Sequence, residues 1–580
     1  GAPPASTVYY YDEIQVPALF HLGLGPQVVH PAMLGTIDFY PGVAPGRYGR
    51  KTGGVMAGQA SDRALRDGVH GELELRLIDV QAYLAKPFKN GARLEVAGRY
   101  GYPVLVLKAV EPKSVVQYWD YQLRGALPVS RRSELSLTAL GSYDMVGERR
   151  DGRFRRDLEL QFHRLELRSV TRFPRATLVA ALGGGVERSG LQDDLDLQSI
   201  RIGPRLWLTT SLGKAKLRVG ADLQLSFGSL TDPRAQRGPP VTFQDPETGE
   251  TITTTPRVPE NPVYLSAKRR FVSGAYLELL WPFAEGWSLE AGLRGDVWVT
   301  AGHAQPALEP RLLLRHQVHP RVGLHVAGGL GYQPAVFMIP VPGLSDVALD
   351  RGLQRVIQSE LGAAVTLPAS FTLESKVFAH FYDHMLSLEA LEEDAASCER
   401  VEGSAPACTP NPDALGRMSA YAYGLELLVR RAFKETLSGW VAYTLSWADG
   451  RTDDGLALRP HFDVRHVANL IFLWRINAKW RASLRGYVQS GRFPLGASTE
   501  YDPRARERLP PFWRGDLQLA RVWKKSWGEL QLSLDWLNFT LRKEPIGWED
   551  CPAPGREGSC KVEYLNVPIT VPMIGLRGSF

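Results

Sequence analysis

Apolar and polar residues alternate along most of the chain. From residue 216 to residue 227 every second position is apolar, and most positions between carry charged, amide or hydroxyl side chains. The same alternation recurs at 72–77, 287–294 and 529–536. Because side chains on a β-strand point to opposite faces in turn, this period of two predicts strands with one apolar face. No long segment shows a helical period of similar clarity.

The length and the polar faces of these strands indicate a membrane-spanning barrel. Many runs reach about ten residues, which is the length of a tilted strand that crosses a bilayer. Their polar faces carry charges of both signs, which a water-filled lumen accommodates and the core of a soluble sandwich does not. A closed barrel leaves no unpaired backbone in lipid. No run approaches the ~18 consecutive apolar residues of a transmembrane helix.

The connections between strands also alternate. We count about 22 strands, which start near Val69 and end at Phe580, provided that 70–86 is split near Ile78; without that split the count is 21. All the long connections follow odd-numbered strands, so one rim carries short turns and the other carries long loops. The long connections are 229–270, 335–352, 389–417, 492–509 and 542–570. The expected fold is all-β, a 22-stranded antiparallel transmembrane β-barrel.

Composition narrows the class of protein. The chain has 580 residues, of which 44% are hydrophobic and 10% aromatic, and this excludes a disordered chain. The net charge of +6 comes from 68 basic and 62 acidic residues, so nothing indicates a nucleic-acid partner. The first residues lack the basic start and apolar core of a secretory signal.

The first 66 residues differ from the rest, and they resemble part of a known domain. The segment Tyr9–Pro17 resembles the "hydrophobic strand, then DG-x-P" passage of the plug domain in TonB-dependent outer-membrane receptors. Ile37–Gly42 resembles the "IE-V-x-x-G" strand of that plug, and Arg47–Val55 resembles its "YG…GGV" ending. We therefore expect residues 1–66 to form the C-terminal part of a plug domain inside a barrel of residues 67–580. The plug motif residues are Tyr48, Gly49, Arg50, Gly53 and Gly54.

The end of the chain resembles the same family. Residues 509–516 are similar to its "LP-P-x-x-R-x-D" strand, residues 534–538 to "V-x-N-L-x-N", and residues 574–580 to its closing strand. The resemblance implies that the terminal aromatic residue, Phe580, is the signal for the barrel-assembly machinery.

The resemblance is incomplete at the start. The first half of the family's plug and its TonB box have no counterpart after Gly1, and Glu13 replaces the usual glycine. Three explanations stay open: the missing part precedes Gly1 in a longer chain, it is removed or supplied by another chain, or the barrel naturally has half a plug and leaks. Coupling to the TonB complex would then require an N-terminal region absent from this chain. Within the plug, we expect Arg47, Arg50 and Lys51 to pair with luminal acids such as Glu72 and Glu74.

The four cysteines form two local pairs in predicted extracellular loops. Cys398 and Cys408 lie in one loop, and Cys551 and Cys560 lie in another. Short disulfide-closed loops suit an oxidising envelope, and each would stabilise its loop by roughly 2–3 kcal/mol. A zinc site would need closer spacing and a second pair of ligands. We expect two disulfides.

The sequence contains no catalytic motif. It lacks a Gly-x-Ser-x-Gly elbow, a Walker loop and a His-Glu-x-x-His pair, so we expect no enzyme, no cofactor and no metal site. His380 and His384 would share one face of a strand, where a structural role is favoured over a metal-chelating one. His21 and His30 lie in the plug segment, and nothing in the sequence distinguishes them.

These observations lead to one main hypothesis. We expect a TonB-dependent receptor in the outer membrane of a Gram-negative bacterium that actively takes up a scarce nutrient, such as a siderophore, cofactor, glycan or peptide. Its partners would be the TonB complex, an extracellular ligand, outer-membrane lipid and possible surface or periplasmic proteins. The alternative is a passive pore, or a protein-export or surface-complex barrel, of the same architecture with an incomplete plug. A soluble β-propeller would show a repeat of roughly 40–50 residues, which is not found.

Overall fold

A computed structural model gives the fold of the chain. No helix among its described residues is long and apolar enough to cross a membrane. The structure describes residues 6–23, 25–61, 68–103, 112–150, 152–191, 195–231, 241–244, 251–254, 269–300, 303–334, 352–386, 417–432, 436–453, 455, 457–494, 507–549, 561–564 and 570–580.

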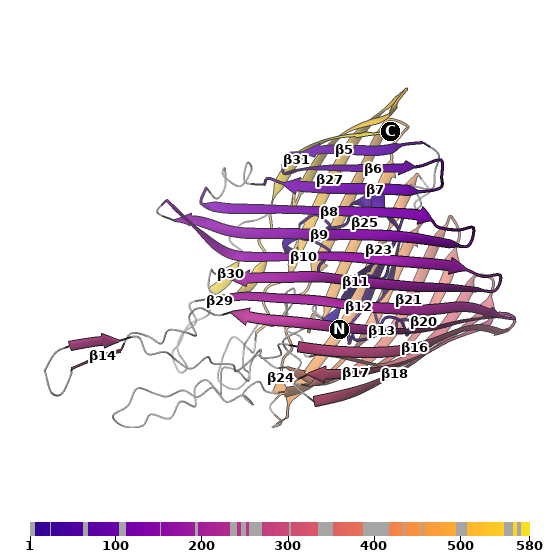
Figure 1. Cartoon of the computed structure of the whole chain (residues 1–580). Coiled ribbons are helices and arrows are strands. Elements are labelled where there is room, and N and C mark those ends of the chain that lie inside the picture. Colours follow the sequence, from indigo (N-terminus) through magenta and orange to yellow (C-terminus); the bar gives the residue numbers. More distant parts are fainter. Residues whose placement is uncertain are drawn as a thin grey trace.

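Twenty-two antiparallel strands close into one barrel, as the alternation predicted (Figure 1). The two-residue strand β24 (Ala457–Leu458) pairs only with β23, and β23 also pairs directly with β25, so β24 adds no further position to the ring. The split near Ile78 is confirmed, because β5 and β6 are separate strands. The barrel strands are β5 (His70–Arg76), β6 (Asp79–Pro87), β7 (Arg93–Gly101), β8 (Ser114–Pro128), β9 (Ser133–Arg150), β10 (Arg153–Arg172), β11 (Ala176–Leu191), β12 (Leu195–Leu212), β13 (Ala215–Thr231), β16 (Arg269–Ala284), β17 (Trp287–Thr300), β18 (His303–His319), β19 (Val322–Pro334), β20 (Leu353–Leu367), β21 (Phe371–Leu386), β22 (Arg417–Arg431), β23 (Leu437–Thr452), β25 (His466–Arg475), β26 (Trp480–Gln489), β27 (Phe512–Lys525), β28 (Gly528–Leu537) and β31 (Val571–Ser579).

The two rims differ in the way that the loop pattern predicted. Strands such as β12 and β13 are joined on one rim by only two residues, whereas the widest separations, such as that between β13 and β16, lie on the other rim. The second rim also carries two small hairpins, which lie at the left-hand end of the barrel in Figure 1. These hairpins are β14 (Val241–Gln244) with β15 (Thr251–Thr254), and β29 (Pro545–Glu549) with β30 (Lys561–Tyr564).

The two faces of the wall have opposite chemistry. Outward-pointing apolar side chains such as Leu223 and Leu534 are exposed, as lipid-facing residues are in a protein without its bilayer. Inward-pointing charged side chains such as Arg294 and Glu309 are buried. This arrangement explains an average hydrophobic content without any long apolar run, because every second residue of a strand faces the lumen.

A small sheet occupies the lumen. Its strand order is β2–β1–β4–β3, and β1 runs parallel to β4 while the other two pairs are antiparallel (the N-terminal segment is indigo in Figure 1). An apolar cluster joins this luminal sheet to the wall, with Tyr11, Ile14 and Met33 packed in the same core as Tyr83 and Phe162. The luminal elements are β1 (Val8–Tyr11), β2 (Ile14–Val16), the 3-10 turns η2 (His21–Gly23) and η3 (Pro31–Met33), β3 (Leu34–Tyr40) and β4 (Val55–Ala60).

The barrel closes where its last strand meets its first. β31 pairs antiparallel with β5, and beyond the last paired position Gly71 and Phe580 exchange two backbone hydrogen bonds of 3.0 Å. The ring of Phe580 lies over Gly71, where a Cβ atom would stand 2.4 Å from its Cζ atom. The absence of a side chain at Gly71 therefore makes room for the terminal aromatic ring.

We predict that Gly71→Val weakens this closure. The added side chain must displace the Phe580 ring, and overpacking of this kind costs roughly 1–3 kcal/mol. The midpoint of thermal unfolding, followed by the gel mobility of samples incubated at rising temperatures and loaded without boiling, should fall. Gly125→Val is the matched control on the same outer face, because a Cβ atom added there would lie 4.0 Å from its nearest neighbour. Equal midpoints for the two variants would contradict the prediction.

Candidate functional site

The turn between β1 and β2 holds two residues in the left-handed backbone region. Asp12 has φ +49° and Glu13 has φ +68°, and the turn is a two-residue hairpin because Tyr11 pairs with Ile14. Such turns favour Asn-Gly or Asp-Gly, since glycine adopts positive φ without steric cost. Glutamate at the second position is therefore strained, and its surroundings must stabilise it.

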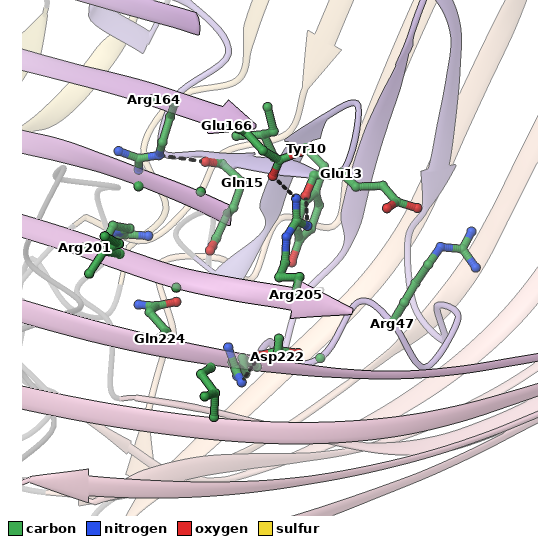
Figure 2. A pocket seen from close by; sticks show the side chains of 18 of the residues that line it. Tyr10, Glu13, Gln15, Arg47, Arg164, Glu166, Arg201, Arg205, Asp222 and Gln224 are labelled. Carbon is green, nitrogen blue, oxygen red and sulfur yellow. Dashed lines mark hydrogen bonds and ion pairs between the residues drawn. The ribbon is translucent and has the colours of Figure 1, made fainter. Parts of the chain in front are cut away.

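Four arginines from the wall hold this turn, and we call them the arginine clamp. They come from β10, β12 and β13, and Figure 2 shows two of them converging on the hairpin. The carboxylate of Glu13 receives one of these bonds and its carbonyl oxygen another. The four bonds are Arg164 to the Gln15 carbonyl oxygen (3.0 Å), Arg168 to Asp12 Oδ2 (3.2 Å), Arg205 to the Glu13 carbonyl oxygen (2.6 Å) and Arg218 to Glu13 Oε1 (2.8 Å).

The clamp determines the charge of Glu13. Burial alone would raise the pKa of its carboxyl group, but the guanidinium of Arg218, with Arg168 and Arg205 nearby, lowers that pKa below its ordinary value. Glu13 is therefore ionised, and its ion pair with Arg218 offsets the strain of its backbone.

Wall carboxylates neutralise the clamp from the other side. Glu166 bonds both Arg168 and Arg205, and Glu187 bonds both Arg164 and Arg201. A cavity of about 160 Å³ opens beside these side chains, between the luminal hairpin and strands β10–β13 (Figure 2). The clamp thus has carboxylate partners on both the hairpin and the wall, and it lies next to a cavity.

A second set of ion pairs holds the plug motif. Arg50 donates from Nε to Asp296 (2.9 Å) and also binds Asp222, and Arg294 donates 2.7 Å bonds to both of the same carboxylates. Gly49 makes this approach possible, because a Cβ atom there would lie 2.1 Å from the Cδ atom of Arg294. The motif thus brings its backbone directly onto the wall.

Lys51 is buried and has an unusual environment. Its ammonium group donates to the carbonyl oxygens of Gly42 (3.1 Å) and Gly53 (2.8 Å). Burial lowers the pKa of Lys51 to about 7. Gly42 in turn contacts the wall so closely that a Cβ atom would overlap the carboxylate of Glu360.

The expected pairing with luminal acids is found for Arg47 and Arg50, although with acids other than Glu72 and Glu74, and it is wrong for Lys51. Arg47 pairs with Glu278 (2.8 Å) and not with Glu72 or Glu74. Arg50 pairs with Asp222 and Asp296. Glu72 pairs with Arg577 (3.5 Å), and Glu74 accepts a bond from Gln81. The acids nearest in sequence lie on another part of the ring. Lys51 bonds carbonyl oxygens, as described above.

The remaining plug-motif residues also lie at this contact. Tyr48 is buried and packs on Tyr10 with ring centroids 4.9 Å apart. A Cβ atom on Gly53 would lie 2.6 Å from the backbone of Ser6, and one on Gly54 would lie 3.1 Å from the carbonyl oxygen of Tyr40. Their assignment as a plug motif, and that of Phe580 as an assembly signal, stay predictions.

Two other sets of candidate residues have different outcomes. Cys398, Cys408, Cys551 and Cys560 all lie outside the described residues, so the two disulfides stay predictions. His380 and His384 do not form a pair on one regular face, because the register of β21 shifts after Tyr382 and His384 adopts φ +58°. Within the described ranges, no group of three or more His, Cys, Asp or Glu residues is placed to hold a metal ion.

Sequence reasoning missed a fully buried polar contact of the luminal segment. Both ring nitrogens of His21 bond carboxylates of the wall, Asp120 on β8 and Asp144 on β9. No signal in the sequence points to this contact, because His21 lies 99 and 123 positions before its two partners and the three residues follow no motif.

Comparison with known proteins identifies the family. The family model described as "TonB dependent receptor-like, beta-barrel" matches residues 111–539. The chain belongs to the TonB-dependent receptor family. It is therefore a β-barrel protein of the outer membrane of a Gram-negative bacterium. No curated protein matches the chain.

Solved structures of TonB-dependent receptors share the fold. The ferric enterobactin receptor PfeA of Pseudomonas aeruginosa has 14% identity and a TM-score of 0.68 over all of this chain and 92% of that chain. The siderophore receptor PirA of Acinetobacter baumannii has 13% identity and a TM-score of 0.66, over 100% and 91% of the two chains. The ferric citrate transporter FecA has 13% identity and a TM-score of 0.64, over 100% and 88%. At these identities the likeness shows the fold alone.

We predict that Arg294→Met loosens the plug motif. Arg294 is 2% exposed, and its loss leaves the buried carboxylates of Asp222 and Asp296 with one arginine fewer, which costs roughly 3–5 kcal/mol for a broken buried pair. Hydrogen exchange of a peptide covering 47–55 should become faster.

Arg315→Met is the matched control for this measurement. The side chain of Arg315 is half exposed in its pair with Glu290, and such pairs contribute about 1 kcal/mol or less. Exchange of the same peptide should stay unchanged in this control. Equal acceleration in both variants would show that the Arg294 network does not hold the motif.

Proposed function

We propose that this protein imports a large, scarce nutrient across the outer membrane and that the luminal sheet is its gate, moved by energy supplied through TonB. The observation that carries the proposal is the polar contact between the sheet and strands β10–β18. There the clamp and the Arg50 network hold the sheet by ion pairs beside a cavity. When the sheet separates from the wall, both partners of each ion pair return to water and recover their desolvation penalty, so these contacts cost less to release than a packed apolar core.

The seating of the sheet supports a gated receptor over a permanently open pore. Its hairpin, its motif loop and its 3-10 turns each bond a different part of the wall, from β8 to β20. An element that bonds the wall at so many positions has a fixed place in the lumen, as a gate requires. Family membership supports the same function, because TonB-dependent receptors are receptors and transporters.

We infer that the nutrient is an iron chelate of the siderophore class. The support comes from the structural neighbours, which are receptors for ferric enterobactin and siderophores and a ferric citrate transporter. The long connections on the second rim would bind the ligand and select among such chelates.

The test is uptake and conductance of the complete gene product. Cells that express it should accumulate iron from ferric enterobactin or ferric citrate only when TonB is functional, and the purified protein in planar bilayers should carry no steady current. Steady current together with TonB-independent uptake would contradict the gate and support the passive pore. TonB-dependent binding or growth on another nutrient, with neither chelate transported, would overturn the siderophore class and leave the gate standing.

A further inference from the structure

His21 is clamped between two carboxylates of the wall. Its Nδ1 atom lies 2.7 Å from Asp144 Oδ1, and its Nε2 atom lies 3.0 Å from Asp120 Oδ2. The imidazole is fully buried, and the two carboxylates are at most 5% exposed. His21 belongs to the luminal segment and the two acids belong to neighbouring barrel strands, so these bonds join the gate to the wall.

The geometry determines the charge of the ring. A carboxylate accepts hydrogen bonds, and a neutral imidazole has only one N–H group to donate. Two acceptors at the two nitrogens therefore require the doubly protonated imidazolium. Burial opposes this charge, but the hydrogen bonds that the ring donates to Asp120 and Asp144 raise the pKa of His21 above its ordinary value.

Other polar and charged side chains surround His21 and Asp120. The Nε atom of Arg99 on β7 lies 3.8 Å from Asp120 Oδ2, and Gln122 donates a 2.9 Å bond to Asp120 Oδ1. Tyr118 packs against the imidazole with ring centroids 4.7 Å apart, and its hydroxyl donates to Asp79 on β6. Among the described residues, the imidazolium and Arg99 are thus the cations that face the pair of acids.

His30 provides an internal contrast in the same segment. Its ring stacks on Tyr83 with centroids 5.6 Å apart, and its Nδ1 atom accepts a 3.1 Å bond from the backbone N–H of Ala32. Burial lowers the pKa of His30 to about 4. His30 is therefore neutral above about pH 4, including the neutral range in which His21 carries its proton.

We propose that His21 is a protonated pin that fastens the luminal residues 20–23 and 25–33 to strands β8 and β9, and that release of these residues is coupled to loss of the proton. On release above neutral pH, the N–H proton of the imidazolium passes to water, and Asp120 and Asp144 keep their charges. The pin acts on the attachment of the sheet and not on a ligand, so its test is independent of the nutrient that is transported.

The direction of the pH dependence follows from the raised pKa. Attachment through His21 is fully present below about 6.5, the ordinary pKa of histidine, and is lost as pH rises through the higher value in the folded protein. Deprotonation leaves one ring nitrogen with a lone pair facing a buried carboxylate, which is repulsive. Alkaline conditions should therefore loosen this segment before the barrel itself.

The experiment is hydrogen exchange of the full chain in detergent, followed for a peptide covering 20–33 and corrected for intrinsic rates, from pH 6 to pH 10. In the unmodified protein, protection of this peptide should fall as pH rises, while protection of barrel strands far from the pin, such as β25 and β26, stays constant. In His21→Gln, protection of the peptide should be low and independent of pH. The matched control His30→Gln should keep the pH dependence.

A third variant keeps the proposal testable if His21→Gln does not assemble. Asp144→Asn removes one of the two carboxylates, so the pH at which protection is lost should shift downward. Constant protection of the peptide in the unmodified protein would overturn the proposal. The proposal would also be overturned if the pH dependence persisted in His21→Gln, or if the midpoint pH of Asp144→Asn did not move.

Discussion

Closure of the backbone ladder is the constraint on which the rest of the structure depends. In a bilayer every N–H and C=O group of a spanning segment must find its partner within the protein, and only a ring of strands satisfies this with extended chain. The last strand therefore pairs with the first, and Phe580 completes the ladder against Gly71. Alternation then gives lipid the apolar face and leaves the other face, with its charges, to the lumen.

Because the wall presents charged side chains to the lumen, an element that packs there must offer them partners of opposite charge. The luminal sheet meets the wall in two ways. Near β6–β10 it contributes to an apolar cluster, beside the His21 contact. Near β10–β18 it meets arginines and carboxylates that share partners, as Asp222 is shared by Arg50 and Arg294. Shared partners make these contacts cooperative. Because partners are shared, water or a neighbouring side chain can replace one that is displaced. The apolar cluster near β6–β10 can therefore attach the sheet firmly, while the ion pairs near β10–β18 are compatible with movement.

The sequence was sufficient for the wall and insufficient for the contacts across the lumen. The period of two and the parity of the loops predicted the 22 strands, because both follow from local geometry that repeats along the chain. They do not determine which strands lie opposite a given luminal residue. Arg47 therefore meets Glu278 and not Glu72, and the partners of His21 carry no signal at all. Such contacts depend on how the segment is placed against a closed ring.

Glu13 shows how far these contacts determine local structure. The sequence marked it as a departure, since the family has glycine where this chain has glutamate. A left-handed backbone costs a residue with a side chain roughly 1 kcal/mol or more. Arg218 binds the Glu13 carboxylate and Arg205 binds its carbonyl oxygen, so the wall holds the side chain and the peptide in the strained form. Outside the barrel the hairpin loses both bonds and retains its strain. Docking therefore stabilises the strained turn relative to the free segment, and this links the local geometry of the hairpin to its attachment.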